Sequence, residues 1–168
     1  IASAKEIKPG VGVAKISCDG EFAKITGDNF EHIFNMHYGH IENICGTLTS
    51  PMKLSVWRAP TDNDRGIKNK WFDENYDKQY NKVYDSRIEG NKIIVNGALS
   101  TVSRMNFFKY TAVYTFFADG RIDVTVDGEF DNTRTFLPRL GFEFKTAEKK
   151  FEYFGYGPYE SYIDMQKR

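Results

Sequence analysis

The chain has 168 residues, and its 23 lysines and arginines balance its 23 aspartates and glutamates. This length suits one domain, and 40% hydrophobic with 27% charged residues is the composition of a folded protein rather than a disordered one. The zero net charge provides no long-range attraction to nucleic acid or anionic lipid. No apolar run approaches the roughly 20 residues of a membrane span, and no signal peptide is recognisable. We therefore predict neither nucleic acid nor a membrane as a partner.

The first ten residues, which end in Lys8-Pro9-Gly10, predict a linker that leads into the first strand. Runs with strand-like alternation follow at residues 14–18 and 22–25, and Asp19-Gly20 between them predicts a turn. Because the chain begins with Ile1 rather than Met, we expect it to be a piece of a larger protein.

The next candidates for chemistry are cysteines and histidines. Cys18 and Cys45 could form a disulfide if the fold brought them together, but two reduced and partly buried thiols are the simpler interpretation. The chain has three histidines, His32, His37 and His40, and the last two would share a face only on a helix. The surrounding residues do not predict a helix, so we predict no metal site.

An apolar run at residues 52–57 predicts a strand that leads into a dense polar segment, residues 57–66. Pro60 interrupts a central strand, and the Asp, Asn and Gly residues after it favour turns. Two interpretations stay open for this segment. It is either a well-capped loop in which Arg58 pairs with a carboxylate, or a ligand site.

Calcium is a weaker alternative for the same segment, because Asp62 to Asp64 resemble the opening of a calcium loop. An EF-hand has a glutamate at its twelfth position and flanking helices. Counted from Asp62, the twelfth residue here is Asp73, and no helix is predicted before the segment. After the loop at residues 65–70, we expect a short helix near residues 71–80.

The second half of the chain predicts strands. Residues 89–91 form a turn signal before a run at 92–95. Residues 110–116 and 121–130 alternate apolar and polar side chains on either side of Asp119-Gly120, which predicts an antiparallel hairpin because both turn residues tolerate positive φ.

Two further runs at residues 140–144 and 151–154 predict additional strands. Strands that recur at intervals of about 8–12 residues are typical of a β-sandwich or barrel. The expected fold is therefore mainly β and antiparallel.

A second cluster, residues 154–162, is rich in glycine and aromatic residues. It is not a dinucleotide fingerprint, because the third glycine and the following helix are missing and Pro158 intervenes. A glycosidase needs two carboxylates about 5–9.5 Å apart, and the sequence does not identify such a pair. The residues alone thus predict a β-rich domain without an assignable catalytic centre.

Three segments in this order resemble the C-terminal domain of bacterial β-galactosidases of glycoside hydrolase family 2. They are the Trp57 to Gly66 segment, the Pro-Arg-x-Gly motif at Pro138 to Gly141, and the Gly-x-Gly-Pro-x-Glu turn at Gly155 to Asp164. The resemblance extends from about Val11 to the end of the chain. It implies a β-sandwich of the galactose-mutarotase-like supersandwich type, of which residues 11–168 are a truncated N-terminal part.

The resemblance also implies a function for the whole enzyme. Family members hydrolyse terminal β-D-galactosides with retention, and their two catalytic glutamates lie on a barrel domain outside this chain. We therefore expect no catalytic residue here and no cofactor in the chain, while the family often uses Mg²⁺ and Na⁺ elsewhere. Expected partners are the barrel and other domains of the parent enzyme, a galactoside substrate and further copies in a homo-oligomer. The expected location is the bacterial cytoplasm.

Within the family, the loop that follows the Arg-Ala-Pro-x-Asp-Asn-Asp segment approaches the mouth of the active site. We hypothesise that Asp62, Asn63, Asp64 and Gly66, together with this adjoining loop, form a substrate-side border or lid, with Gly66 as its hinge. Arg58 would hold the base of this loop by a charge-assisted bond to Glu160 or to an aspartate of the motif, and Arg139 would act similarly. The expected structural motif comprises Trp57, Arg58, Pro60, Arg139, Gly155, Gly157, Pro158 and Glu160.

Two other classes of function stay open. A stand-alone carbohydrate-binding module would stack aromatic faces such as Trp57, Trp71 or Tyr156 on sugars. A sugar epimerase needs a general acid and base, usually a glutamate and a histidine, facing one sugar. The sequence shows no recognisable partner for its histidines, so the epimerase is the weaker alternative.

Overall fold

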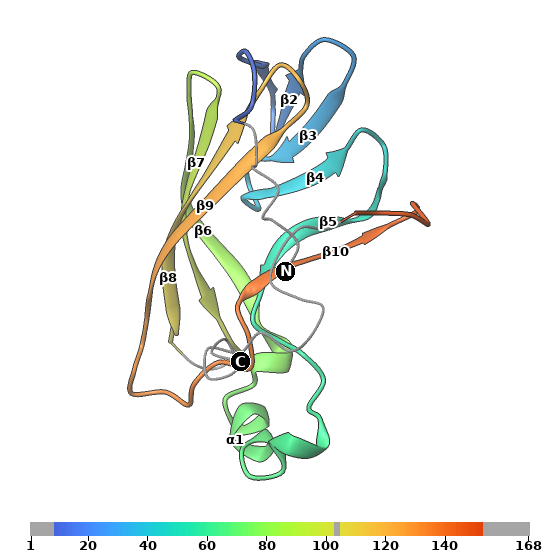
Figure 1. Cartoon of the computed structure of the whole chain (residues 1–168). Coiled ribbons are helices and arrows are strands. Elements are labelled where there is room, and N and C mark those ends of the chain that lie inside the picture. Colours follow the sequence, from blue (N-terminus) through green and yellow to red (C-terminus); the bar gives the residue numbers. More distant parts are fainter. Residues whose placement is uncertain (1–8, 103–104, 153–168) are drawn as a thin grey trace.

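The computed structural model describes residues 9–102 and 105–152, which form two antiparallel sheets packed face to face (Figure 1). This arrangement confirms the predicted mainly β, sandwich-like fold. One sheet has six strands in the order β1-β2-β3-β4-β5-β10. Its strands are β1 (Lys15–Asp19), β2 (Phe22–Thr26), β3 (Glu31–Asn35), β4 (His40–Ile44), β5 (Leu48–Ser55) and β10 (Gly141–Thr146).

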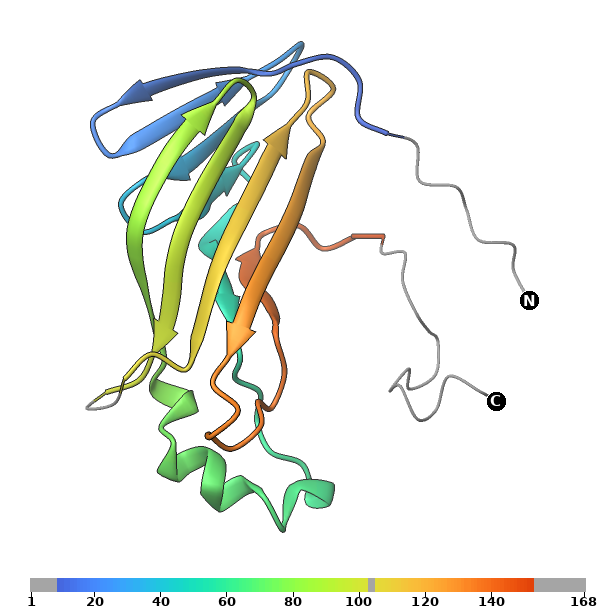
Figure 2. The same cartoon turned by 90° about the vertical axis from the view of Figure 1, so that its left-hand side faces the viewer.

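The other sheet is a meander of four longer strands that follow one another along the chain. They are β6 (Tyr80–Glu89), β7 (Lys92–Ser100), β8 (Phe108–Phe116) and β9 (Ile122–Phe130). Between β5 and β6 lies the connecting segment, residues 56–79, which carries three short helices. These are the 3₁₀ helices η1 (Asp62–Asp64) and η2 (Tyr76–Lys78), and the α-helix α1 (Lys68–Asp73). Both views place α1 at one end of the sandwich (Figures 1 and 2).

The core lies between the sheets because each inner face presents apolar side chains at every second position. On β8, the alternate residues from Phe108 to Phe116 are buried, as the period-two pattern predicts. Phe34 of β3 meets Tyr114 edge-on with ring centroids 4.9 Å apart, and Phe116 at 6.5 Å. The two sheets therefore share one aromatic core.

The predicted hairpin at residues 110–130 is confirmed as β8 and β9, but its turn differs from the prediction. The Phe117 amide donates to the Arg121 carbonyl, and the Gly120 amide donates to the Phe117 carbonyl. Only Gly120 has positive φ, at 88°. The loop therefore contains three residues with a glycine bulge, and not two residues of positive φ at Asp119-Gly120.

Three other expectations need correction. Strand β5 ends at Ser55, before the predicted limit at Trp57. Helix α1 begins at Lys68, inside the stretch expected to be a loop, while Tyr80 already belongs to β6. Phe151 lies outside any strand, and residues 153–154 of that predicted run lie outside the described residues.

Pro51 lies inside β5, where sequence rules disfavour proline. The pairing of β5 with β10 shifts register here, because Glu143 pairs with Lys53 but Lys145 pairs with Ser50. The Lys145 amide donates to the Ser50 hydroxyl instead of to the ladder. A bulge thus removes the need for a backbone donor at Pro51.

Candidate functional site

The predicted polar segment is organised around one ion pair. Arg58 donates to both carboxylate oxygens of Asp64, from Nη1 at 2.6 Å and from Nη2 at 2.8 Å. The Asp64 side chain is only 10% exposed, and this two-pronged geometry is the strongest that arginine forms with a carboxylate. The aspartate alternative expected for Arg58 is therefore observed, whereas Glu160 lies outside the described residues.

Asp64 is also bonded to the start of η1. Its Oδ2 accepts from the Thr61 amide at 2.6 Å and from the Thr61 hydroxyl at 3.0 Å. Hydrogen bonds from Arg58 and then from the Thr61 amide lower the pKa of Asp64 far below its usual range. Because these donors already occupy its oxygens, Asp64 acts as the cap of this loop.

The remaining residues of the expected border are on the surface. Asp62, Asn63 and Gly66 are exposed. Gly66 does not have positive φ, and a Cβ added there would contact nothing within 4 Å. No neighbouring atom therefore excludes a side chain at position 66. The lid hypothesis for Gly66 depends only on the conformational freedom of its backbone.

Gln79, the last residue of the connecting segment, contacts the first residue, Val56. The Gln79 side chain accepts from the Val56 amide at 2.9 Å and donates to the Leu54 carbonyl at 3.2 Å. One amide side chain thus joins the two ends of the segment. The loop begins and ends at a fixed place beside β5.

Helix α1 also contacts the ion pair, through Trp71. The Arg58 guanidinium carbon lies 5.2 Å from the centre of the Trp71 ring, close enough for a cation–π interaction. Trp71 is 1% exposed and donates from Nε1 to the Phe136 carbonyl at 2.9 Å. It is therefore not available to stack on a sugar, which corrects its expected role in a carbohydrate-binding module.

The loop after β9 is attached to the same structure. Tyr76 donates to the Thr135 carbonyl at 2.5 Å, and Arg134 Nη1 donates to Glu74 at 2.9 Å. Burial acts to lower the pKa of Arg134, but the bonds to Glu74 and Asp131 raise it on balance. We refer to Arg58, Asp64, Trp71, Glu74, Tyr76 and Arg134 as the end cluster.

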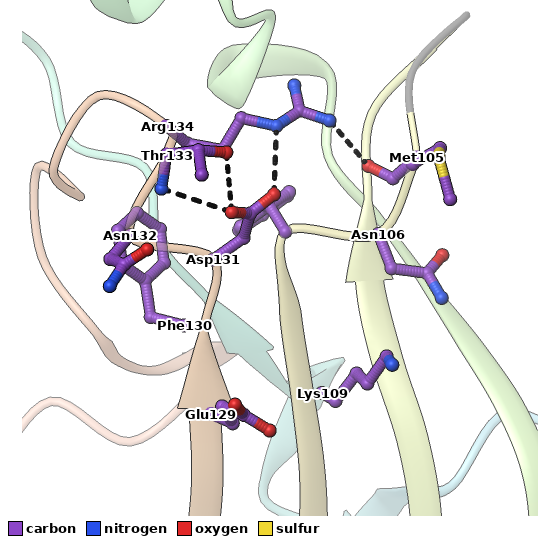
Figure 3. Close-up of a pocket in the computed structure, with 10 residues that line it drawn as sticks. Met105, Asn106, Lys109, Glu129, Phe130, Asp131, Asn132, Thr133 and Arg134 are labelled. Atoms are coloured by element: carbon purple, nitrogen blue, oxygen red, sulfur yellow. Dashed lines mark hydrogen bonds and ion pairs between the residues drawn. The ribbon is translucent and has the colours of Figure 1, made fainter.

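A cavity of about 650 Å³ adjoins the end cluster (Figure 3). Asp131 accepts from the amide and the hydroxyl of Thr133, and these bonds lower its pKa. Arg134, which follows β9, also donates to the carbonyl of Met105, which precedes β8. This hydrogen bond connects the two sides of the cavity opening. The walls carry both signs of charge. They include Lys109 and Glu129, which are opposite each other in the register of β8 and β9.

A model of the beta-galactosidase small chain family matches residues 26–167. The chain belongs to the beta-galactosidase small chain family. It is 36% identical over 123 residues to a beta-galactosidase of Actinobacillus pleuropneumoniae, covering 70% of this chain and 12% of that protein. It is 30% identical over 149 residues to one of Staphylococcus xylosus, covering 83% of this chain and 15% of the relative. The chain thus spans less than a fifth of these beta-galactosidases.

The structure describes three further members of the expected structural motif, Trp57, Pro60 and Arg139. Arg139 is paired with Glu143 at 3.4 Å, and both side chains are largely exposed, so it does not hold the polar segment in the way that Arg58 does. Trp57 is half-buried against Phe72, with ring centroids 5.3 Å apart. Pro60 is half-buried. Gly155, Gly157, Pro158 and Glu160 lie outside the described residues.

Sequence reasoning missed Glu74, Tyr76 and Arg134. Their partners are about 60 residues away along the chain, so no local pattern connects them. The only local signal was Asp131-x-Thr133, a combination that favours an Asx turn. The cavity beside them was therefore not predicted.

The histidines and cysteines are placed as follows. His40 Nε2 donates to the Glu42 carboxylate at 3.1 Å, so it has a partner that sequence reasoning did not recognise. Cys18 and Cys45 form no disulfide, and both are exposed, which contradicts the expected partial burial. Within residues 9–102 and 105–152, no group of three or more His, Cys, Asp or Glu side chains could hold a metal ion. No helix in the same ranges is long and apolar enough to cross a membrane.

Proposed function

We propose that this chain is a non-catalytic domain of a β-galactosidase that hydrolyses terminal β-D-galactosides with retention. In this proposal residues 11–168 pack against the catalytic barrel, which carries both catalytic glutamates and, with other domains, the Mg²⁺ and Na⁺ sites. The enzyme acts in the bacterial cytoplasm as a homo-oligomer. The observation that carries the proposal is the family match over residues 26–167.

The exposed surface supports association with other parts of such an enzyme. Four large apolar side chains around β10 are between 49% and 80% exposed: Phe136, Leu140, Phe144 and Phe151. Several large exposed apolar side chains within one stretch of the chain, here residues 136–151, support an interaction site. We expect the rest of the enzyme to cover these side chains.

The end cluster supports a role for residues 62–66 at the border of the active site. A lid needs a rigid base and a mobile tip. Asp64 is bonded on all sides and connects through Arg58 to buried Trp71, which supplies such a base. Gly66, two residues later, has open space around it and supplies the position at which the backbone can move.

The test is the variant Gly66→Ala in a complete enzyme. We expect kcat and KM to change together, since hinge substitutions alter closure in both directions. Gly141→Ala is the matched control, because a Cβ there also meets nothing within 4 Å and Gly141 lies on β10. Unchanged kcat and KM in Gly66→Ala would exclude the lid.

The domain role is tested separately with the isolated chain. We expect no turnover of an aryl β-galactoside by the chain alone, and turnover when the remaining part of the enzyme is added. Activity of the chain alone would contradict the proposal. Titration with lactose or galactose addresses the stand-alone binding module, which predicts saturable binding to the isolated chain.

A further inference from the structure

The turn between β4 and β5 has an unusual residue at its tip. Cys45 and Gly46 have φ values of 50° and 76°, and the Thr47 amide donates to the Ile44 carbonyl at 2.9 Å. Positive φ at both central positions defines a type I′ turn, in which asparagine or glycine is the usual first residue. Here the turn presents an exposed thiol.

This thiol faces a buried histidine. Cys45 Sγ lies 3.6 Å from His32 Nδ1, and His32 is 1% exposed. On the other side of the ring, His32 Nε2 lies 3.0 Å from the Gly120 carbonyl oxygen. A carbonyl only accepts, so Nε2 carries the hydrogen and Nδ1 of the neutral ring is left as an acceptor. The thiol is therefore the donor to Nδ1.

The arrangement has the three parts of an activated nucleophile. They are the thiol of Cys45, the imidazole of His32 as base, and the Gly120 carbonyl, which fixes the tautomer. The Phe30 ring lies over the imidazole with centroids 4.5 Å apart and restricts its orientation further. None of these residues belongs to the end cluster.

A cavity adjoins the Cys45 thiol. Cys45 lines a cavity of about 370 Å³ together with Glu31 and Asn43. Asn43 Oδ1 is buried, and it is the one such side-chain atom without a hydrogen-bond partner within residues 9–102 and 105–152. Asn43 Nδ2 donates to the Leu48 carbonyl at 3.3 Å, which holds this side chain beside the cavity. The cavity leaves room for a small disulfide next to the Cys45 thiol.

We propose that Cys45 is a site of thiol–disulfide exchange that takes small disulfides. The Cys45 proton passes to His32 Nδ1, and the thiolate sulfur attacks one sulfur of R–S–S–R. A Cys45–S–S–R bond forms while the original S–S bond breaks. The leaving R–S⁻ takes the proton from His32, so the products are the mixed disulfide and R–SH. One disulfide is consumed and one is formed.

Cys18 is a matched internal control. It is also exposed, but its Sγ donates to the Gly20 carbonyl at 3.8 Å, and a carbonyl oxygen does not act as a base for the thiol. Cys18 lies near the end of β1 and Cys45 in the turn that follows β4, and both strands belong to the same sheet. Their rates of modification therefore compare an exposed thiol with a base against one without.

The experiment mixes the reduced 168-residue chain with cystamine, stops the reaction with acid, and measures both adducts by peptide mapping. We expect Cys45 to react at least about tenfold faster than Cys18, since general-base assistance contributes about 10²–10⁴ in enzymes. In His32→Gln the ratio should fall toward one.

Two results would overturn the proposal: equal rates in the native chain, or a ratio unchanged in His32→Gln. If His32→Gln does not fold, the native chain in concentrated urea replaces it. Unfolding separates Cys45 from His32, so the two rates should converge. A ratio that persists in urea would show that the fold does not activate Cys45.

Discussion

The four-stranded sheet and the connecting segment are stabilised in different ways. In the sheet, β8 pairs with β9 from Phe108↔Phe130 to Phe116↔Ile122 without a register shift, and an aromatic core covers one face. The segment has no ladder, and a few long-range side-chain contacts, mainly those of Gln79 and the end cluster, attach it. Loss of one side chain therefore disturbs the structure of the segment more than that of the sheet, and the disturbance stays within the segment.

Trp71→Ala should have the largest effect on the segment. The substitution leaves a cavity, removes the hydrogen bond to the Phe136 carbonyl and removes the ring that contacts the Arg58 guanidinium. We expect the free energy of unfolding to fall by about 3–5 kcal/mol, measured by urea denaturation. Phe72→Ala, at a side chain 46% exposed, is the control and should cost less than about 1 kcal/mol. Equal losses would contradict the distinction between the two side chains.

Gly97→Ala is the corresponding change in the sheet. An added Cβ would lie 2.8 Å from the Tyr110 hydroxyl and 2.9 Å from the Lys82 carbonyl. We expect a loss of about 1–3 kcal/mol from overpacking, measured by thermal and urea unfolding. Gly66→Ala in the segment has open space and should change stability by less than about 1 kcal/mol. A larger loss in Gly66→Ala would also compromise its use in the kinetic test.

Asp64 predicts an effect at acid pH. Its pKa is lower in the folded chain than in the unfolded chain, whose aspartates titrate near about 3.9. The unfolded state therefore binds protons first, and stability falls as the pH decreases below about 4. Asp64→Asn should be less stable at pH 7 and should lose part of this acid dependence, measured by urea denaturation between pH 2 and 7. Asn63→Ala, an exposed neighbour, should keep it.

Tyr114 predicts a smaller effect at alkaline pH, confined to the sheet. Burial raises the pKa of Tyr114 above its usual value. The unfolded chain ionises first as the pH passes about 10, so stability present below that pH is lost above it. Tyr114→Phe should reduce this alkaline loss in unfolding measurements between pH 8 and 11. Tyr38→Phe, at an exposed position, should behave as the unaltered chain.

The sheet and the segment also differ in how far the sequence predicts them. The β8–β9 hairpin follows from alternation and from Gly120, because both signals are local. The ion pair of Arg58 with Asp64 was one of the expected alternatives, since the two residues are only six apart. Arg134 with Glu74 is 60 residues apart, and tertiary packing alone selects it.

Two local features misled or escaped sequence reasoning. Pro51 is compatible with β5 because a bulge in the pairing with β10, a partner much later in the chain, lies opposite it. The turn at Cys45-Gly46 contains no asparagine or aspartate, so the sequence does not predict it. The contact between the Cys45 thiol and the His32 imidazole appears only in the folded structure. In both cases a distant residue decides the local conformation.

The pairing of β5 with β10 has a consequence for synthesis on the ribosome. Ser55 and Glu143, which are bonded across the two strands, are 88 residues apart along the chain. At roughly 5–20 residues per second, β10 is translated about 4–18 s after β5. During that interval one edge of β5 lacks its final neighbour, and an unpaired edge is a template for aggregation. Pro51 lies inside β5, and because it has no backbone N–H it offers a foreign strand one donor fewer while the four-stranded meander is being made.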